Sequence, residues 1–574
     1  MSDPIKHECA VAMLRLLKSP EYYREKYGSS HYGYRKLLLL LEKQHNRGQD
    51  GAGIVSLSFN PEPGKPAYNI CKSAAANPLP DLLERIGDAD GYRGELLLGH
   101  LRYATFGKND VGYCHPFVHE STCLERLFML AGNFNLTSGK AMMDHFLATG
   151  HHPSATSDGY LLTQTIAHYL EQERDSGLKH IRWAELLRNA LEPMDGAFTL
   201  CGMNGMGDSF AIRDARGIRP GYYYMDDEVV VVASERPAIQ AAFNLTTDQV
   251  KELPAGQVLV IRREGDVSFQ PCLPEQEHRS CVFERIYFSR GNDADICRER
   301  KALGRALMPA ILKQVDEDFE HSVFSYIPNS ALLCYQGLVD SLNEEAAKRG
   351  TLARSGQVAV KDAKFRTFIS DEESRKELYM HVYDVTYGVV EAHKDALVVV
   401  DDSIVRGNTV RNAVLPILDR LAPRKIVMAS SAPPVKYPDC YGIDMSTTSE
   451  LIAFRAAVSV LRKHGREHVL REAYNLAKVD LNPPHGHVSK NRLKMIYDAV
   501  DEEELIQEIA RMLTPVGLKA EFTVVYQTCE DLRKCCPNHT GDWYFTGDYP
   551  TPGGNAVANR ALVNFMENKK ERAY

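Results

Sequence analysis

The sequence lacks a long apolar run, because no stretch approaches the roughly 18 residues needed to cross a bilayer. Its first residues, MSDPIKHE, are polar, which excludes a secretory signal of the usual kind. It also lacks a basic stretch that could follow a nucleic-acid backbone, and its net charge is only -8. We therefore expect a soluble protein without membrane or nucleic-acid partners, whose local loops hold any small anionic substrate.

Internal repeats and low-complexity segments are missing as well. The 574 residues are too many for one hydrophobic core, so we expect two domains and an extension. The thirteen cysteines are odd in number and scattered along the chain. Without a secretory signal, this pattern indicates reduced thiols in the cytoplasm.

The most informative stretch that is present is VVVDDSIVRGNT, at 398–409. The apolar run at 396–400 predicts a strand buried on both faces of a parallel sheet. Gly407 permits a tight backbone whose amides face a phosphate, and Thr409 adds a hydroxyl where a helix is expected to begin. Apolar residues at helical spacing up to Leu421 and a second strand at 425–431 complete a βαβ unit. The nucleotide-triphosphate pattern GxxxxGK[ST] is absent.

Asp401 and Asp402 close the first of these strands. Their carboxylates can accept hydrogen bonds from the cis hydroxyls of a ribose and stabilise positive charge at its anomeric carbon. The alternative, more common for an isolated Asp-Asp pair, is an acidic turn after a buried strand.

The whole string resembles the phosphoribosyl pyrophosphate (PRPP) loop of type I phosphoribosyltransferases, and of amidophosphoribosyltransferases in particular. The resemblance implies that Mg²⁺ is bound by the two carboxylates, and Asn408 is a mild departure, since the family pattern ends GTT. The PRPP-binding residues that it implies are Asp401, Asp402, Ser403, Arg406, Gly407, Asn408 and Thr409.

A second set of motifs lies in the amino-terminal half. Cys9, in HECAVAM, is by itself most often a small buried hydrophobe. It is followed in order by QHNRGQDGAG (44–53), GHLRYATFG (99–107), GNFNLT (132–137) and SDG (157–159). Together these strings resemble the class II glutamine amidotransferase domain, which belongs to the N-terminal-nucleophile hydrolases.

The chemistry of glutamine hydrolysis assigns a role to Cys9. If the leader, residues 1–8, is removed, Cys9 supplies both the thiol nucleophile and, through its freed α-amino group, a base with a pKa near 8. Asn133 offers a side-chain amide and Phe134 a backbone N–H to the oxyanion of the tetrahedral intermediate. The family usually has glycine at the position of Phe134.

Three further residues are expected to bind glutamine. Arg102 can form a forked contact with the α-carboxylate, and Asp158 can hold the α-ammonium. Arg47, in the QHNRGQDGAG string, is assigned to the same site by the resemblance. Without the neighbouring motifs, a surface ion pair would be the preferred interpretation of Arg102 and Asp158.

Further strings extend the resemblance along the chain. Tyr287 stands where the family has a tyrosine that couples the two sites, although a core aromatic is an equal alternative. YGIDM is expected to begin a helix that continues through Glu450 and Leu451. The strings are RDARGIRPGYYY (213–224), SERPAI (234–239), LPAGQVLVI (253–261), CVFERIYFSRGN (281–292), KFRTFIS (364–370) and YGIDM (441–445).

The resemblance implies an αββα sandwich at 9–272, followed by a phosphoribosyltransferase α/β domain with a parallel sheet at 273–482. A carboxy-terminal extension at 483–574 completes the chain. The boundary is expected in the charged, proline-containing stretch 263–280.

Two departures concern the transferase half. In HVYDVTYG, at 381–388, Asp384 occupies the position of a family lysine. In the string IPNSA, at 327–331, the family usually has an acidic residue and a further hydroxyl. In this sequence the last position of the string is Ala331.

A third departure concerns iron. Some family members hold an iron-sulfur cluster through four cysteines, including a CxxC before FTG, but this chain has residues 541–544 there. We therefore expect no iron-sulfur cluster. Cys529, Cys535 and Cys536 lie near His539, but a single loop carries them, so free thiols are favoured over a zinc site.

The implied activity transfers the amide nitrogen of glutamine to PRPP. The products would be 5-phosphoribosylamine, glutamate and pyrophosphate, in the first step of purine synthesis. The family further implies Mg²⁺, inhibition by purine nucleotides and a homo-oligomer, in the form of a tetramer. Two alternatives stay open: a non-catalytic paralogue that senses PRPP or purines, and a class II amidotransferase with another acceptor.

Overall fold

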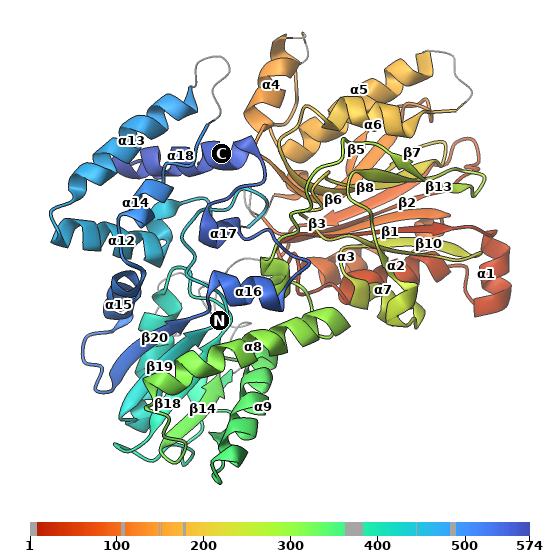
Figure 1. The fold of residues 1–574 in the computed structure, drawn as a ribbon. Helices are drawn as coiled ribbons and strands as arrows, with labels where there is room; N and C mark the ends of the chain where they lie inside the picture. The colour runs from red at the N-terminus through yellow and green to blue at the C-terminus, as the bar shows by residue number, and fades with distance from the viewer. Residues whose placement is uncertain are drawn as a thin grey trace. The chain divides into compact units, whose positions relative to one another are not determined.

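The computed structural model describes residues 8–104, 110–148, 150, 152–175, 180–361, 383–443, 445–482 and 489–573. The chain divides into two compact units, coloured along the sequence in Figure 1. The amino-terminal unit contains Lys6–Cys281 and the short segment Cys440–Asp444, and the carboxy-terminal unit contains the remainder. The first unit extends beyond the expected boundary at 272, because the following residues stay bonded to it. Cys281 N–H donates to the Ile218 carbonyl at 3.2 Å, and Ser280 donates to the Gly217 carbonyl at 2.7 Å.

The amino-terminal unit contains two antiparallel sheets, with strand orders β11-β9-β10-β1-β4-β2-β3 and β13-β12-β8-β7-β6-β5. Their strands are β1 (Ala10–Leu16), β2 (Gly51–Leu57), β3 (Tyr68–Ser73), β4 (Leu96–Arg102), β5 (Phe117–His119), β6 (Phe128–Leu136), β7 (Gly196–Asn204), β8 (Ser209–Arg213), β9 (Tyr222–Met225), β10 (Val229–Ala233), β11 (Lys251–Glu252), β12 (Gln257–Ile261) and β13 (Val267–Pro271). Their helices are α1 (Pro20–Tyr27), α2 (Tyr32–Glu42), α3 (Pro78–Ile86), α4 (Gly139–Ala148), α5 (Asp158–Asp175), α6 (Trp183–Leu191) and α7 (Arg236–Phe243).

Strand β1 shows why these elements form four layers. Its side chains alternate between two cores, as the pleat requires. Val11 and Met13 join residues of the other sheet, such as Met129, in a core between the sheets. Leu14 faces the opposite way and packs with Leu37 of α2. Helices α5 and α6 cover the outer face of the second sheet. Since each buried leucine contributes about 1.5–3 kcal/mol, burial on both faces favours this αββα arrangement, which confirms the expected fold.

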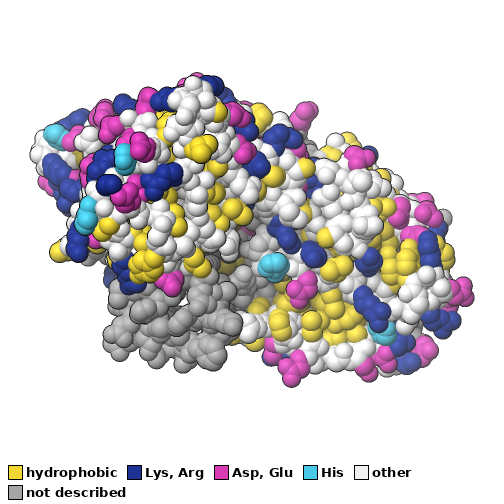
Figure 2. Space-filling view, turned by 90° about the horizontal axis from the view of Figure 1, so that it is seen from below, with side chains coloured by type: hydrophobic (Ala, Val, Ile, Leu, Met, Phe, Trp, Pro, Cys, Tyr) yellow, Lys and Arg dark blue, Asp and Glu magenta, His cyan; other side chains and the backbone are white. Residues whose placement is uncertain are grey.

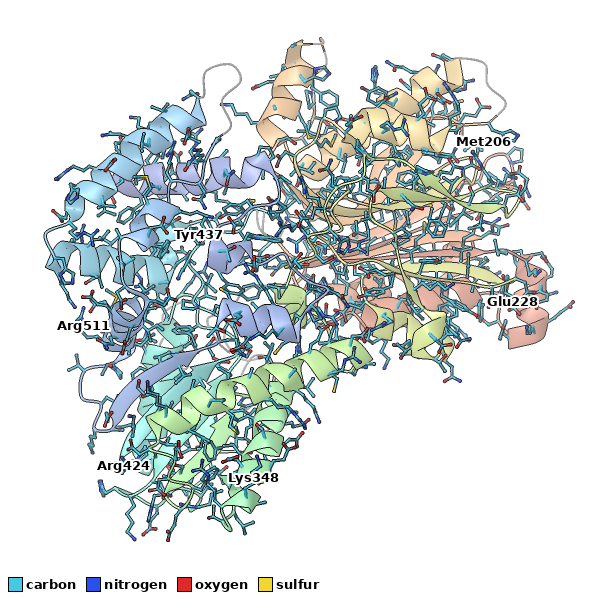
Figure 3. The ribbon with its side chains drawn as sticks, viewed as in Figure 1. Met206, Glu228, Lys348, Arg424, Tyr437 and Arg511 are labelled. Atoms are coloured by element: carbon cyan, nitrogen blue, oxygen red, sulfur yellow. The ribbon has the colours of Figure 1, made fainter. Side chains whose placement is uncertain are left out.

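Helix α1 is attached to the turn before β10 through Glu228, which is labelled in Figure 3. The Glu228 carboxylate accepts hydrogen bonds from Tyr22 at 3.0 Å and Tyr27 at 2.7 Å, and it pairs with Lys26. All three partners lie on one helix at helical spacing. This contact joins the amino-terminal helix to the sheet that carries β1.

The carboxy-terminal unit is built on a parallel sheet with the order β15-β14-β18-β19-β20. Its strands are β14 (Ser322–Tyr326), β15 (Arg354–Ser355), β18 (Ala396–Asp401), β19 (Lys425–Ser430) and β20 (Glu521–Tyr526), beside a separate ribbon of β16 (Ala359–Lys361) and β17 (Tyr383–Val385). Its helices are α8 (Ala294–Gln314), α9 (Leu332–Lys348), α11 (Leu415–Leu418), α12 (Ile452–Lys463), α13 (Glu467–Leu481), α14 (Lys494–Asp498), α15 (Glu502–Leu513), α16 (Cys529–Cys535), α17 (Trp543–Thr546) and α18 (Pro552–Met566).

The region after residue 482 differs from the expected separate extension. Strand β20 lies in this region and pairs in parallel with β19, with Val427 opposite Thr523. Helix α18 packs against α13, and Figure 1 draws the two side by side. The residues from 489 onward therefore complete the sheet and its helical cover, because without them β19 would present an unpaired edge.

The expected βαβ unit is present, with β18 and β19 where the apolar runs predict them. The predicted helix between them is interrupted. Residues Val410–Val414 form a π-helical turn, α11 follows, and Asp419–Leu421 form a 3-10 turn. Pro416 explains the irregularity, since it has no N–H to donate and its ring crowds the preceding turn.

The predicted helix beginning at YGIDM is wrong in its position. A 3-10 turn at Thr448–Glu450 precedes α12, and Cys440–Ile443 are irregular. This short segment packs in the amino-terminal unit, where Asn135 Nδ2 donates to the Cys440 carbonyl at 2.5 Å. The Gly442 backbone has φ +131°, and a Cβ there would lie 2.9 Å from Arg219. Tertiary contacts with Asn135 and Arg219 thus take the place of a helix.

The surface carries charges of both signs. On the face shown in Figure 2, lysine and arginine side chains are interspersed with aspartate and glutamate, which agrees with the mild net charge of -8. Among the described residues, none of the helices combines the length and the hydropathy required of a membrane span.

Candidate active sites

Cys9 lies directly before β1 and is half-buried. Its Sγ accepts a hydrogen bond from the Tyr103 N–H at 3.3 Å. Burial raises the pKa of the Cys9 thiol to about 11, although the Tyr103 bond and the Arg102 charge both oppose this shift. With the leader attached, Cys9 is therefore a neutral thiol near neutral pH.

The residue before Cys9 is held by the same unit. The Glu8 carboxylate is buried, with 1% of the residue exposed. Its Oε2 lies 3.3 Å from Arg47 Nη1 and accepts a hydrogen bond from Asn133 Nδ2 at 3.3 Å, while Oε1 pairs with Arg219. We call these four residues, Glu8, Arg47, Arg219 and Asn133, the Glu8 clamp.

Arg47 is an expected glutamine ligand that the structure places in this clamp. Its guanidinium is completely buried, and its Nε donates to Glu235 at 2.7 Å. Asn46 donates to the same Glu235 oxygen at 2.6 Å. Arg47 thus lies between the carboxylates of Glu8 and Glu235, which favours a role in supporting the site over direct contact with a free amino acid.

Arg102 and Asp158 are brought into the surroundings of Cys9. Arg102 is the last residue of β4, and its guanidinium lies over the Tyr113 ring, 5.5 Å from the centroid. Asp158 is the first residue of α5 and is half-buried. The charge of Arg102 lowers the pKa of the Cys9 thiol and that of Asp158 raises it. A cation and an anion next to the nucleophile match the two charges of a free amino acid.

The expected oxyanion donors lie next to each other on β6. Asn133 is 2% exposed, and its amide is engaged by Glu8. Phe134 is half-buried and packs on the His115 ring, with centroids 5.3 Å apart. A Cβ at Gly132 would lie 2.9 Å from the Phe134 ring and 2.7 Å from the Thr199 carbonyl. The neighbouring strand backbone and the Phe134 ring therefore both require glycine at 132.

Two histidines that the sequence did not single out support this strand. The His100 and His115 rings stack with centroids 4.0 Å apart. His115 Nδ1 accepts the Gly132 N–H at 3.3 Å, and His100 Nε2 lies 3.1 Å from the Gly132 carbonyl. Burial lowers the pKa of His100 to about 3 and that of His115 well below its usual value. Two neutral rings therefore hold the backbone next to Asn133.

The expected PRPP loop follows β18. Asp401 and Asp402 are each 1% exposed. Burial raises the pKa of both carboxyls, and the neighbouring Asp402 charge raises that of Asp401 further. Asp401 Oδ1 accepts the Asp402 N–H at 2.9 Å, whereas Asp401 Oδ2 is buried without a hydrogen-bond partner among the described residues. A buried carboxylate oxygen without a partner fits a hydroxyl or a cation.

Ser330 was missed as a functional residue. It lies in IPNSA, the string that differs from the family pattern, and its hydroxyl donates to Asp402 Oδ1. Ser403 donates to the other oxygen, Oδ2, at 3.1 Å. Both hydrogen bonds favour the charged carboxylate and oppose the effect of burial on the pKa of Asp402. Ala331 is buried and supplies no polar group.

The rest of the loop is fixed by neighbouring helices. Gly407 has φ +80°, and a Cβ there would lie 2.4 Å from Leu513 of α15. Arg406 pairs with Glu450 at 2.7 Å, and its carbonyl accepts a hydrogen bond from Arg455 at 2.6 Å. Asn408 is exposed, and Thr409 is buried at the start of the π-helical turn. The positive φ confirms the backbone expected at Gly407.

Three other sequence predictions concern Asp384, the KFRTFIS string and Tyr287. Asp384 is exposed on the β16–β17 ribbon, opposite Val360. His381 and Val382, the KFRTFIS string and most of the leader lie outside the described residues. Tyr287 is half-buried in the π-helical turn Glu284–Phe288, 5.3 Å from the Phe288 ring, so its coupling role stays a prediction.

Aromatic side chains occupy the place, before FTG, where some family members have the CxxC named above. Trp543 and Tyr544 are completely buried, and Trp543 Nε1 donates to Asp439 at 3.0 Å. Cys536 is buried as well, whereas Cys529 and Cys535 are half-buried. Within the described ranges, no group of three or more His, Cys, Asp or Glu side chains could hold a metal ion.

Several curated proteins of the same name are similar to this chain over most of its length, although no family model matches it. Amidophosphoribosyltransferase of Escherichia coli is 27% identical over 430 residues, which cover 73% of this chain and 80% of that protein. The Bacillus subtilis enzyme of the same name is 28% identical over 440 residues, covering 76% and 82%. The Methanocaldococcus jannaschii enzyme is 28% identical over 437 residues, covering 72% and 83%.

Solved structures extend this similarity to the fold. Glutamine PRPP amidotransferase of B. subtilis, complexed with ADP and GMP, superposes with a TM-score of 0.66 at 23% identity, covering 95% of this chain and 97% of that one. A structure of the allosteric regulatory enzyme of purine biosynthesis matches with the same TM-score and covers 96% of that chain. The chain is therefore a homologue of the amidophosphoribosyltransferases, in sequence over about three quarters of its length and in fold over nearly all of it.

Proposed function

We propose that this chain hydrolyses glutamine at Cys9 and transfers the ammonia to PRPP bound at 401–409, which forms 5-phosphoribosylamine, glutamate and pyrophosphate. The observation that carries the proposal is the buried pair Asp401 and Asp402 at the end of a central parallel strand, where one oxygen of Asp401 has no hydrogen-bond partner among the residues that the structure describes. The occurrence of a cysteine flanked by Arg102 and Asp158 in the same chain adds the nitrogen-donating half.

In the amino-terminal unit, Cys9 would act after the leader is removed. Its freed α-amino group accepts the thiol proton, and the sulfur attacks the side-chain amide of glutamine. Arg102 binds the substrate carboxylate and Asp158 its ammonium. Asn133 then donates to the oxyanion, with the Phe134 N–H as a second donor. The carbon–nitrogen bond then breaks, the Cys9 α-ammonium returns its proton to the leaving nitrogen, and ammonia departs, which leaves a thioester on Cys9. Water hydrolyses this thioester, which releases glutamate and restores the thiol.

In the carboxy-terminal unit, Asp401 and Asp402 accept the ribose hydroxyls and stabilise positive charge as the pyrophosphate leaves. Arg406, Gly407 and Thr409 lie on the loop that would surround the 5-phosphate. The two carboxylates fit Mg²⁺, which in proteins commonly binds one or two carboxylates together with substrate phosphates. Bound there, Mg²⁺ would neutralise charge on the pyrophosphate.

The partners implied by the resemblance remain part of this proposal. Inhibition by purine nucleotides is supported by the ADP and GMP in the complex of the B. subtilis relative. We also propose a homo-oligomer, with a tetramer as the first form to test. All thirteen cysteines are free thiols, which fits the expected reducing compartment, the cytoplasm.

One assay decides between this function and its rivals. Purified mature protein is incubated with glutamine and Mg²⁺, with and without PRPP, and glutamate, pyrophosphate and phosphoribosylamine are measured. PRPP-dependent formation of all three supports the proposal. PRPP binding without turnover would favour a sensor, for which exposed Asp384 in place of a lysine is the specific observation. Glutamate release at a rate that does not depend on PRPP would favour a class II amidotransferase that delivers ammonia to another acceptor.

A further inference from the structure

Residues 113–117 lie next to the three side chains to which the proposed function assigns the binding of glutamine. This segment joins the turn Val111–Tyr113 to strand β5 in the amino-terminal unit. Three of its side chains carry aromatic rings: Tyr113, His115 and Phe117. Each ring contacts a different substrate-binding residue or the neighbour of that residue in the sequence.

Tyr113 covers Arg102. The guanidinium carbon of Arg102 lies 5.5 Å from the centroid of the Tyr113 ring, which is a cation–π contact. Arg102 is 6% exposed, and its carbonyl accepts the Asp50 N–H at 3.0 Å. The turn is itself fixed, because Asp110 Oδ1 accepts the Gly112 N–H at 2.8 Å. The ring therefore restricts the directions in which the guanidinium can donate to a substrate carboxylate.

His115 holds the strand that carries Asn133. Its Nδ1 accepts the Gly132 N–H at 3.3 Å, and its ring lies 5.3 Å from the Phe134 ring between centroids. Asn133 stands between these two contacts in the sequence. The position of its side-chain amide therefore depends on the His115 ring.

Phe117 packs on the first turn of α5, which begins at Asp158. The ring is so close that a Cβ at Gly159 would lie 2.3 Å from Cε2 of Phe117. Further along β5, His119 Nδ1 lies 2.8 Å from Gln164 Oε1 of the same helix. Strand β5 therefore fixes the end of α5 that carries the Asp158 carboxylate.

Two glycines let the 113–117 segment lie against β2. A Cβ at Gly51 would lie 2.7 Å from Cys114 Sγ, and one at Gly53 would lie 1.9 Å from the His115 carbonyl oxygen. Only glycine permits an approach this close to a neighbouring backbone. Gly51 also pairs with Arg102 across β2 and β4. The segment thus packs directly on the sheet that contains Arg102.

We propose that Tyr113, Phe117 and His115 are positioning residues, each for one part of the glutamine molecule. Tyr113 directs the guanidinium toward the α-carboxylate, Phe117 places the carboxylate at the start of α5 for the α-ammonium, and His115 sets the side-chain amide that donates to the oxyanion. This inference rests on the proposed function, which assigns those three groups to glutamine.

The three roles differ in the step that they affect. The α-carboxylate and α-ammonium are bound equally before and during the attack on the amide, so losing either contact weakens binding without slowing the chemistry. The oxyanion exists only in the transition state and the intermediate. A displaced oxyanion donor therefore slows the chemistry without weakening the binding of glutamine.

The test measures glutamine hydrolysis by the purified mature protein and separates KM from kcat. We expect Tyr113→Leu to raise the KM for glutamine by about tenfold, the scale of a desolvated cation–π contact, with little change in kcat. Phe117→Leu should likewise raise KM and not kcat. His115→Leu should lower kcat by about tenfold or more and leave KM unchanged, since the oxyanion donor is displaced but not removed.

Conservative variants separate these roles from an effect on folding. Tyr113→Phe keeps the ring, and His115→Asn can place an oxygen near the position of Nδ1, so each should recover most of what its leucine variant loses. Val111→Ala, which changes an exposed side chain of the same turn, should match the wild type. The proposal is overturned if the three leucine variants alter the same kinetic constant, if none alters either, or if Tyr113→Phe behaves as Tyr113→Leu.

A second measurement distinguishes failure of this inference from failure of the proposed function. Phenylglyoxal modifies guanidinium groups, and its reaction with Arg102 is followed by peptide mass without any substrate. Arg102 should react several-fold faster in Tyr113→Leu than in the wild type or Tyr113→Phe, because the ring no longer covers it. Equal rates in the three proteins overturn the role of Tyr113 even if glutamine is hydrolysed. Faster reaction in a protein that does not hydrolyse glutamine supports that role and contradicts the proposed function.

Discussion

The imidazole rings of His100 and His115 lie stacked, 4.0 Å apart between centroids, and burial lowers the pKa of both, which favours the neutral form of each ring. They hold the backbone of Gly132 from two sides, at 3.1 Å and 3.3 Å. The expected oxyanion donor Asn133 is the next residue. Any change that charges this pair therefore acts on the amino-terminal site and on its stability together.

The first prediction is a loss of stability in mild acid. In the unfolded chain each histidine takes up a proton below its usual pKa of about 6.5, whereas folded His100 stays neutral down to about 3. Between these two pKa values the unfolded state therefore binds more protons than the folded state. As the pH decreases through this range, the free energy of unfolding decreases by about 1.4 kcal/mol per pH unit for each histidine. Denaturant unfolding at a series of pH values measures this slope. His115→Gln should reduce it by one histidine's share.

The second prediction concerns the nucleophile. The mature protein should begin at Cys9, since the α-amino base does not exist while the bond to Glu8 is intact, and intact mass tests this. Cys9→Ala should abolish glutamine-dependent synthesis of phosphoribosylamine and retain synthesis from added ammonia, because the acceptor site lies in the other unit. Cys123→Ala, which removes another partly exposed thiol, is the control. Loss of both activities in Cys9→Ala, or full activity with residues 1–8 attached, would contradict the mechanism.

The third prediction concerns the carboxylates after β18. Asp401→Asn and Asp402→Asn should each lower ammonia-dependent synthesis by roughly a hundredfold or more, the effect of removing one preorganised electrostatic group. Basal glutamine hydrolysis should persist, and its stimulation by PRPP should weaken. Steady-state rates with ammonia and with glutamine measure both effects. Equal losses of hydrolysis and synthesis would indicate that the residues support folding of the whole chain.

The fourth prediction concerns Ser330, whose hydroxyl donates to Asp402. Its loss leaves burial less opposed, so Ser330→Ala should raise the pKa of Asp402 and lower synthesis by about threefold to tenfold, in line with about 1 kcal/mol for a lost hydrogen bond. Because a charged Asp402 is then reached only at higher pH, the acidic limb of the rate profile should move upward. Ser330→Thr keeps the hydroxyl and serves as the control. If Ser330→Ala lowers the rate just as much in an Asp402→Asn background, the two residues act independently.

The fifth prediction is that purified protein is colourless and contains no stoichiometric iron. The chain has buried Trp543 and Tyr544 near FTG, where a cluster ligand pair would be needed. Metal analysis and the visible spectrum decide it. Stoichiometric iron with a brown absorbance would show that Cys529, Cys535 or Cys536 serve as ligands.

The sequence by itself determined the features that depend on a few neighbouring residues. The continuous apolar run before Asp401 can only be buried on both faces, so it predicts the central strand β18. Gly407 follows from the left-handed backbone that a tight loop needs, and the structure shows it at φ +80°. The types of chemistry, a thiol in one half and paired carboxylates in the other, are equally visible in the string of residues.

Only the tertiary structure decided which distant residues share a site. Glu8 is a charged residue in a polar leader, and nothing near it in sequence indicates that Arg219, over two hundred positions away, buries its carboxylate. The stacking of His100 on His115 and the donation from Ser330 to Asp402 likewise join separate elements. The physical reason is that backbone preferences act over one or two turns, whereas desolvation and charge pairing depend on which elements the fold packs together.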